Sequence, residues 1–184
     1  MQRRPRCQGR RLELAMEKVH FLKKLLDERT KFEHLVNRVH TSRLTISGAV
    51  GRWSVKDTLA HILAYEQYIV DRMAEITRDE IYHPCQSQEK LDAFLQKFGY
   101  PDFGSPLVDD NSANEWIVDK YRNVPLDEVV AHENQAFLSI VGCIEGLKPG
   151  QLDSHKLIER VASNTYEHYQ EHFEQISAWL ETVR

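Results

Sequence analysis

Hydrophobic residues recur at helical spacing over four long segments of this 184-residue chain. The first runs from Leu14 to about Val39, and its apolar positions repeat every three or four residues, which predicts a long amphipathic helix. The second runs from about Val55 to Thr77. Ser54 precedes it as an N-cap, and Asp57 follows three positions later, a spacing that is typical of helix starts.

Two further long helices are expected after residue 124. Pro125 suits the first turn of a helix, and the apolar stripe that follows it ends before the turn sequence LKPG. The last helix should span about Ser154 to Val183. Because the chain shows no alternating β pattern, it predicts an all-α four-helix bundle with at least one long connection.

Residues 78–124 form that long connection. Several helix breakers divide it, namely Pro84, Gly99, Pro101, Gly104 and Pro106. Between them lie two short amphipathic stretches, EKLDAFLQKF and SANEWIVDKY. We therefore expect a long crossover carrying short helices, and its length suggests that it covers a site.

Length and composition fit one globular domain. Hydrophobic residues make up 41% of the chain and charged residues 28%, and the mean hydropathy is -0.53. No apolar run approaches the roughly 20 residues that cross a bilayer, and no secretory signal is evident, so a cytoplasmic protein without a membrane partner is expected. The cysteines lack CxxC spacing and are expected to be reduced thiols: Cys7, Cys85 and Cys143.

Charge is distributed unevenly along the chain. Residues 1–15 contain five Arg and one Glu and so carry +4, which leaves -8 for the remainder of a chain whose net charge is -4. We interpret residues 1–15 as a basic disordered tail or an artefact of the assigned start site before Met16, and residues 16–184 as the folded domain. The acidic domain argues against nucleic acid as a partner.

A histidine pair in the last predicted helix is the first candidate for chemistry. In the segment NTYEHYQEHF, His168 and His172 are four residues apart and therefore lie one turn apart on the same face, where both can reach one ion. His172 falls inside the apolar stripe of that helix, and His168 lies at its edge. The alternative is that both histidines serve packing or hydrogen bonding without a metal, since nine histidines make chance pairs common.

A third ligand should come from another helix. His61 in WSVKDTLAHILAYE and His132 in VVAHENQAF each lie at the flank of an apolar stripe, and periodicity does not distinguish between them. We expect the remaining histidines to be solvated, although one in the crossover could approach the site if the crossover folds over it (His83); the others are His20, His34, His40 and His155.

The combination of GRWSVKDTLAHILAYE with NTYEHYQEHFEQI resembles the DinB/YfiT-like family of helical-bundle metalloproteins, and within it the ClbS/DfsB-type four-helix bundle proteins. In that family one metal-binding histidine follows the WS segment, and two more form an HxxxH pair on the last helix. By position, the resemblance implies His61, His168 and His172 as ligands. It covers roughly residues 17–180 in architecture, but only the two quoted segments are specific, so substrate residues do not carry over.

The resemblance implies a metal-dependent enzyme that acts on small electrophilic molecules in detoxification or self-protection. A divalent ion on three imidazoles, zinc or nickel in the first place, leaves a position for water, whose pKa can fall to about 7. The same position could take the sulfur of a low-molecular-weight thiol. The enzyme would accordingly be a hydrolase or a thiol S-transferase; the alternative is a non-catalytic bundle that binds a small ligand or a protein partner.

Other polar and aromatic residues lie within about a turn of the proposed ligands. Four could carry protons or support the ligands: Tyr65, Glu66, Asn164 and Glu171. Five aromatic residues could line a pocket, although such residues at helical spacing usually belong to the core: Tyr65, Tyr68, Trp116, Tyr166 and Tyr169. Exposed faces of amphipathic helices could also support a homodimer.

Overall fold

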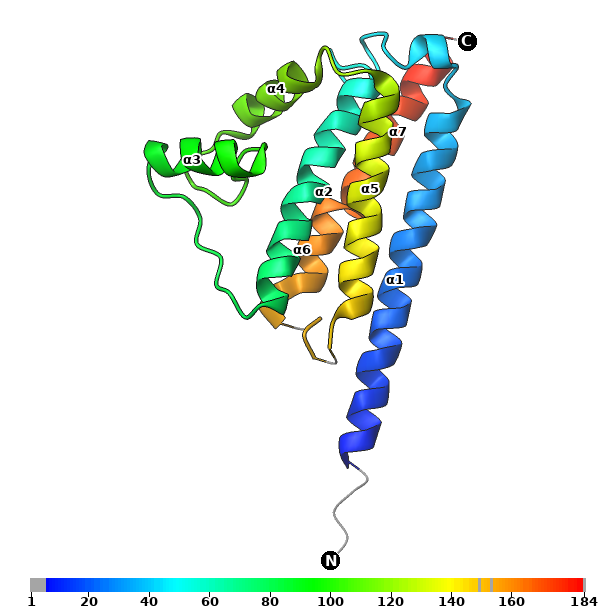
Figure 1. Ribbon diagram of the computed structural model, residues 1–184. Coiled ribbons are helices and arrows are strands. Elements are labelled where there is room, and N and C mark those ends of the chain that lie inside the picture. Colours follow the sequence, from blue (N-terminus) through cyan, green and yellow to red (C-terminus); the bar gives the residue numbers. More distant parts are fainter. Residues whose placement is uncertain (1–5, 149, 153, 184) are drawn as a thin grey trace, which may run out of the picture.

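The computed structural model describes residues 6–148, 150–152 and 154–183. Within these residues the chain is helical, apart from loops and one isolated β-bridge between Val50 and Trp53, which confirms the all-α class. Figure 1 shows a bundle of long helices with two shorter helices to one side. The bundle itself consists of α1 (Arg6–Arg38), α2 (Val55–Thr77), α5 (Leu126–Gly146), the short α6 (Leu157–Asn164) and α7 (Tyr166–Thr182).

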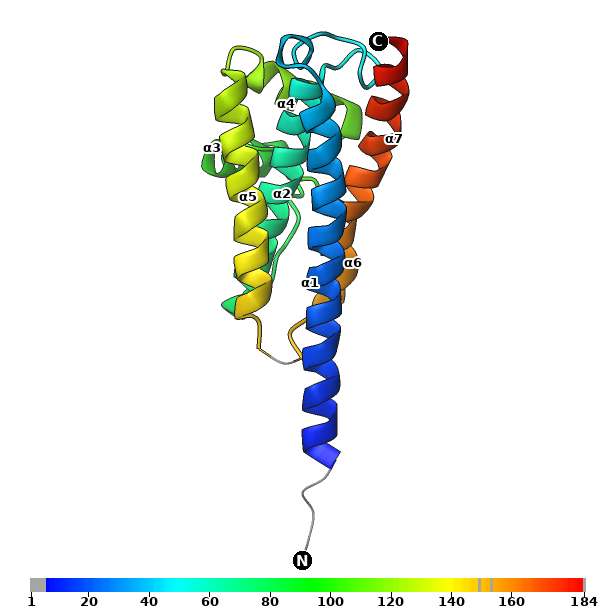
Figure 2. The ribbon, with the colours of Figure 1, turned by 90° about the vertical axis from the view of Figure 1, so that its right-hand side faces the viewer.

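The bundle has four rods, because α6 and α7 follow each other along one line. In the sequence of colours in Figure 1, α1 and α7 run one way while α2 and α5 run the other, so the long crossover returns the chain to the end where α2 began. The closest packing is between α2 and α5 and between α1 and α7, and Figure 2 shows these rods side by side. The helix α2 also contacts α6 and α7, which brings the second and last rods together.

The start of α2 is fixed by a capping box. The Ser54 hydroxyl accepts a hydrogen bond from the Asp57 backbone N–H at 3.1 Å, and the Asp57 carboxylate accepts one from the Ser54 backbone N–H at 2.9 Å. The predicted bounds Val55–Thr77 and the predicted cap are confirmed. Most of α2 is buried, including His61, so this helix crosses the middle of the molecule.

The first helix is longer than the hydrophobic pattern predicted. It begins at Arg6 rather than near Leu14, so residues 6–15 are helical where a disordered tail was expected, whereas residues 1–5 lie outside the described residues. No proline follows Pro5 in this segment, and its Arg, Gln, Leu, Glu and Ala residues favour helix, which accounts for the longer helix. Figure 2 shows this end of α1 extending beyond the bundle.

The last rod is interrupted, which the sequence pattern did not predict. A 3-10 turn at Ser154–Lys156 precedes α6, and Thr165 separates α6 from α7 with φ -132° and ψ -101°. The Thr165 hydroxyl donates to the Val161 carbonyl at 2.6 Å, and the Asn164 amide donates to the Arg160 carbonyl at 2.7 Å. Such side-chain bonds compete with the helical ladder, and α7 therefore begins as a new helix at Tyr166, two residues before His168.

One buried polar network joins all four rods. Arg29 of α1 makes two contacts with the Glu133 carboxylate of α5, one of them at 2.6 Å, and also donates to Asn134 at 2.9 Å. Glu66 of α2 accepts the hydroxyl proton of Tyr169 of α7 and lies 3.7 Å from the Arg29 guanidinium. Around this network, apolar side chains from every rod complete the core.

The crossover carries the two short helices that were predicted, α3 (Gln88–Phe98) and α4 (Asp110–Tyr121). Buried Asp102 joins its two limbs, because the carboxylate accepts the hydroxyl of Tyr82 and the backbone N–H of Cys85, the latter at 2.8 Å. Ser105 donates to the Cys85 carbonyl at 2.6 Å. These bonds fix the turn that contains Phe103.

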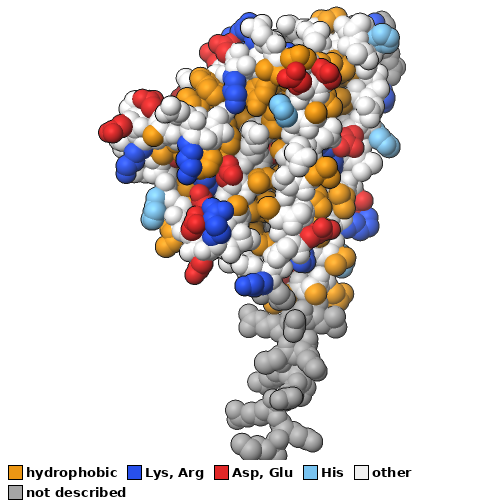
Figure 3. Space-filling model, in the orientation of Figure 1, with side chains coloured by type: hydrophobic (Ala, Val, Ile, Leu, Met, Phe, Trp, Pro, Cys, Tyr) orange, Lys and Arg blue, Asp and Glu red, His pale blue; other side chains and the backbone are white. Residues whose placement is uncertain are grey.

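Charged side chains of both signs are interspersed over the face drawn in Figure 3. No helix in the described part of the chain combines the length and the apolar composition of a membrane span. Cys85 and Cys143 are free thiols, and the side chain of Cys7 lies outside the described residues.

Candidate metal centre

The structure brings three histidines from two helices together. His61 on α2 faces His168 and His172 on α7, and one nitrogen from each ring lies within 4.8 Å of the others. The Nε2 atoms of His61 and His168 are 2.7 Å apart. Three imidazole nitrogens converging in this way form a donor set that could hold a metal ion.

Unsatisfied nitrogen atoms in this cluster fit a metal ion. Nε2 of His172 is buried and has no hydrogen-bond partner among the described residues, and the same holds for Nδ1 of His61 and Nδ1 of His168. His61 and His172 are 4% exposed, so water does not cover these rings. Because buried polar atoms nearly always have partners, the missing partner of the His172 Nε2 atom is consistent with a ligand at the cluster.

Burial keeps these imidazoles neutral. It lowers the pKa of His61 to about 3, with a further contribution from the neighbouring His172. Burial also lowers the pKa of His168 well below its ordinary value and lowers that of His172, where a hydrogen bond to Gln175 acts in the opposite direction. A neutral imidazole has the free lone pair that a metal ligand needs.

Aromatic rings enclose the cluster on the side of the crossover. The Trp53 ring centroid lies 5.0 Å from that of His61, and the Tyr65 ring lies 4.8 Å from His61 and 5.0 Å from His168. Phe103, from the crossover, stacks on Tyr65 at 4.0 Å. The crossover therefore covers the site, as its length suggested.

Tyr65 is held in its neutral form. Burial, with the carboxylates of Asp110 and Glu171, raises its pKa to about 12. Its hydroxyl lies 3.4 Å from the side-chain oxygen of Asn114 on α4, toward which it donates a long hydrogen bond. Tyr65 can therefore donate a proton near the histidines, but it does not act as a base at neutral pH.

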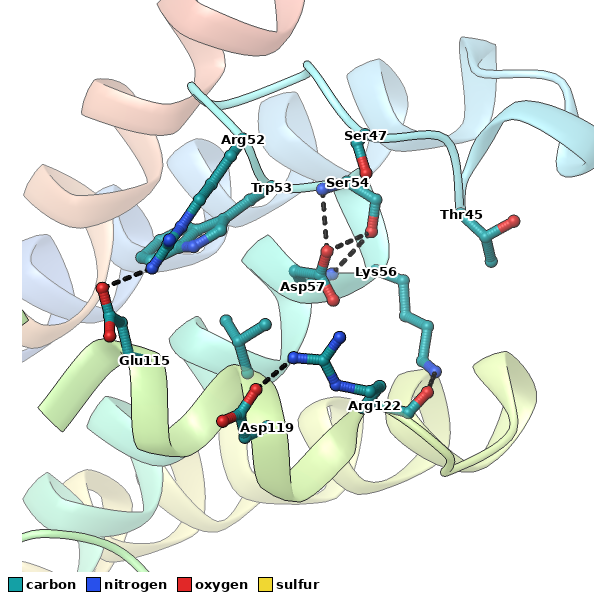
Figure 4. Close-up of a pocket in the computed structure, with 11 residues that line it drawn as sticks. Thr45, Ser47, Arg52, Trp53, Ser54, Lys56, Asp57, Glu115, Asp119 and Arg122 are labelled. Carbon is teal, nitrogen blue, oxygen red and sulfur yellow. Dashed lines mark hydrogen bonds and ion pairs between the residues drawn. The ribbon is translucent and has the colours of Figure 1, made fainter. Parts of the chain in front are cut away.

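A pocket of about 650 Å³ is lined in part by Trp53 (Figure 4). It is lined by hydroxyl groups and by two ion pairs, Arg52 with Glu115 and Arg122 with Asp119. The Trp53 ring contributes to this pocket and also contacts His61. The indole therefore lies next to both the polar pocket and the histidine cluster.

The other histidines do not join the cluster. His132, which the pattern could not distinguish from His61, is exposed on α5 and lines a separate pocket with Asp71 and Tyr100. The side chain of His155 lies outside the described residues. The remaining four are exposed, including the crossover histidine that was considered as a ligand: His20, His34, His40 and His83.

The polar and aromatic residues that the sequence suggested near the ligands lie in different environments. Glu66 is fully buried in the network with Tyr169 and Arg29, and Glu171 is exposed. Asn164 bonds to its own helix. Of the aromatic candidates, only Tyr65 contacts the histidines; three are buried in the core and one is half-buried, namely Tyr68, Tyr166, Tyr169 and Trp116.

Three residues around the cluster were not singled out from the sequence. Trp53 and Phe103 reach the site through loop geometry that periodicity does not encode. Gln175 accepts a hydrogen bond from Nδ1 of His172 at 2.8 Å. Its position three residues after His172 on a helix is a signal that could have identified it.

Comparison with known proteins supports the fold alone. No family model matches the chain, and no curated protein matches it. The chain is similar to the crystal structure of an uncharacterised protein from Escherichia coli UTI89, with a TM-score of 0.67 and 15% identity over 90% of this chain and 93% of that one. This likeness corresponds to an all-α bundle.

Proposed function

We propose that this protein is a metal-dependent enzyme that acts on small electrophilic molecules, and that His61, His168 and His172 hold its divalent ion. The observation that carries the proposal is the convergence of two buried imidazoles and one half-buried imidazole, of which His172 has a buried Nε2 atom that lacks any partner in the described residues. The resemblance of the segments around these histidines to DinB/YfiT-like proteins of the ClbS/DfsB type supports the same assignment.

The three histidines would act as neutral nitrogen ligands and leave further positions around the ion free. When bound, a zinc or nickel ion supplies Lewis acidity toward a water molecule or a low-molecular-weight thiol, which serve hydrolysis and thiol transfer respectively. Because all three rings are already neutral, binding does not require their deprotonation near neutral pH.

The surrounding side chains would orient the reactants and exclude water. Trp53, Tyr65 and Phe103 place apolar surface beside the histidines, which strengthens electrostatic interactions there. The Tyr65 hydroxyl, held beside Asn114, is a proton donor for a leaving group or an opened ring. The polar pocket that Trp53 lines is large enough for a small molecule, and Trp53 also contacts His61.

The proposal is tested first by metal content and then by activity. Chelator-free protein should contain about one divalent ion per chain by elemental mass spectrometry, and the His61→Ala variant should contain none. Metal-loaded protein is then screened against epoxides, activated alkenes and strained rings, with and without added thiols. Consumption that requires both the metal and His61 supports the enzyme, whereas wild-type protein without metal, even after adding zinc or nickel, supports the non-catalytic bundle.

A further inference from the structure

The three histidines differ in how the rest of the protein holds them. Nδ1 of His172 lies 2.8 Å from the side-chain oxygen of Gln175. In contrast, Nδ1 of His61 and Nδ1 of His168 are buried without a partner in the part of the chain that the structure describes. Gln175 is thus the side chain outside the cluster that makes a well-formed hydrogen bond to one of these rings, whereas His61 has a weaker interaction with Asn114, which acts to raise its pKa.

This contact determines where the proton of the His172 ring lies. An amide oxygen only accepts hydrogen bonds, so Nδ1 of His172 is the protonated nitrogen, and Nε2 keeps its lone pair. Nε2 is also the buried atom without a partner. His172 is therefore held in the form of a metal ligand before any metal arrives.

The other two rings are not prepared in this way. Their Nε2 atoms face each other at 2.7 Å, so in the metal-free protein one carries a proton that the other accepts. For both to present lone pairs to one ion, that proton must move to an Nδ1 atom that has no acceptor. Of the three rings, His172 is consequently the one whose tautomer already suits metal binding.

We propose that Gln175 is a positioning residue of this metal centre, whose side-chain oxygen fixes the tautomer and ring orientation of His172 so that Nε2 faces the ion. The inference rests on the proposed function, because it concerns the same three-histidine site. Residues three apart on a helix are neighbours, so α7 itself supplies the contact. Loss of such a partner of a ligating imidazole typically costs about 10–100-fold in metal affinity.

The position of Gln175 makes the inference straightforward to test. Gln175 is exposed, so replacing it leaves the core untouched. Gln170 offers a matched control, because it is an exposed glutamine on the same helix that donates to Glu28 at 3.0 Å and not to a histidine.

The experiment compares wild-type protein with the variants Gln175→Leu, Gln175→Glu and Gln170→Leu. Zinc affinity is measured by competition with a chromophoric chelator, and the His172 tautomer of the metal-free protein is read from imidazole ¹⁵N chemical shifts. We expect Gln175→Leu to bind zinc about 10–100-fold more weakly and to lose the preference for a proton on Nδ1. Gln175→Glu should retain both properties, because a carboxylate accepts the same bond, and Gln170→Leu should match wild type.

Equal zinc affinity and an unchanged His172 tautomer in Gln175→Leu would overturn the role of Gln175 while leaving the metal site intact. If wild-type protein binds no zinc, the proposed function fails and Gln175 has no metal centre to position, but the metal-free spectra still test its effect on His172. A Gln175-dependent proton on Nδ1 then supports the tautomer assignment, and a proton on Nε2 of wild-type His172 overturns it.

Discussion

The Nε2 atoms of His61 and His168 lie 2.7 Å apart across the contact between α2 and α7. These helices are far apart in the sequence, and their rods come together here through the buried His61 ring and the half-buried His168 ring. A metal ion shared by both rings would tie the second and last rods of the bundle together. Metal binding and folding stability should therefore be coupled.

Adding zinc should accordingly stabilise the wild-type protein. A ligand that binds only the folded state at about 100 times its Kd stabilises that state by about 2.7 kcal/mol. We expect the unfolding temperature of metal-free protein to rise on zinc addition, and to stay constant for His168→Ala and His172→Ala. Circular dichroism of these variants should retain most helicity, because the apolar stripes hold the bundle.

The exposed histidine His132 provides the control for this measurement. The His132→Ala variant should show the same zinc-induced rise as wild type, because His132 lies on α5 away from the cluster. A rise that survives in both α7 variants would contradict the assignment of His168 and His172 as ligands.

Glu133 and Glu66 are both buried, but replacing each with Gln should change the unfolding free energy by very different amounts. Glu133 makes a bidentate ion pair with Arg29, so Glu133→Gln leaves the buried guanidinium with the half-buried Glu33 as its remaining carboxylate at hydrogen-bond distance and should cost up to about 3–5 kcal/mol of unfolding free energy. Burial and the nearby Glu133 raise the pKa of Glu66, which favours its neutral form, and Gln replaces that form closely. Urea unfolding of metal-free protein measures both changes; losses of similar size would show that Glu66 is charged as well.

The raised pKa of Glu66 also predicts a dependence of stability on pH. Its unfolded value is about 4.3, so the folded state keeps a proton that the unfolded state releases above that pH. The stability that this proton contributes is complete below about pH 4 and declines as pH rises through the folded pKa, by up to about 1.4 kcal/mol per pH unit.

The Glu66→Gln variant isolates this effect. It lacks the titrating group, so its unfolding free energy should improve relative to wild type as pH rises from 5 to 8, measured in chelator to remove metal. Parallel pH profiles of the two proteins would mean that Glu66 titrates alike in the folded and unfolded states.

Local sequence signals predicted those parts of the fold that local interactions determine. The bounds of α2 follow from its apolar period and the Ser54 cap, and the HxxxH spacing alone places His168 and His172 on one face. The break at Thr165 was not predictable from periodicity, because it depends on side-chain bonds to the preceding turn. The choice of His61 over His132 also needed more than the pattern, since both flank an apolar stripe; the resemblance to a known family indicated it.

The residues that line the candidate site were harder to predict from the sequence. Phe103 follows a proline-containing turn with no periodic signal, and it reaches Tyr65 only because Asp102 joins the two limbs of the crossover. Such placement depends on contacts between residues distant in sequence. The sequence therefore indicated that the crossover would cover a site, but not which side chain would do so.

Gly104 tests whether this crossover is a rigid cover. A Cβ atom at Gly104 would lie 2.6 Å from the Tyr68 hydroxyl and would also clash with the Tyr82 hydroxyl, so Gly104→Ala must displace these tyrosine side chains or the turn that carries Phe103. Overpacking of this kind typically costs about 1–3 kcal/mol. We expect a loss of that size in urea unfolding, together with faster hydrogen exchange at the Cys85 amide, whose bond to Asp102 would be strained.

Gly142 is the matched control for this substitution. It lies within α5 with nothing inside 4 Å of an added Cβ, so Gly142→Ala should stabilise the protein by about 0.5–1 kcal/mol through helix propensity alone. In the Gly142→Ala variant, the Cys85 amide should exchange hydrogen at the same rate as in wild type. If Gly104→Ala were as stable as wild type with unchanged exchange, the crossover would be able to move away from Tyr65 at little cost, and Phe103 would then be a movable gate rather than a fixed wall of the histidine site.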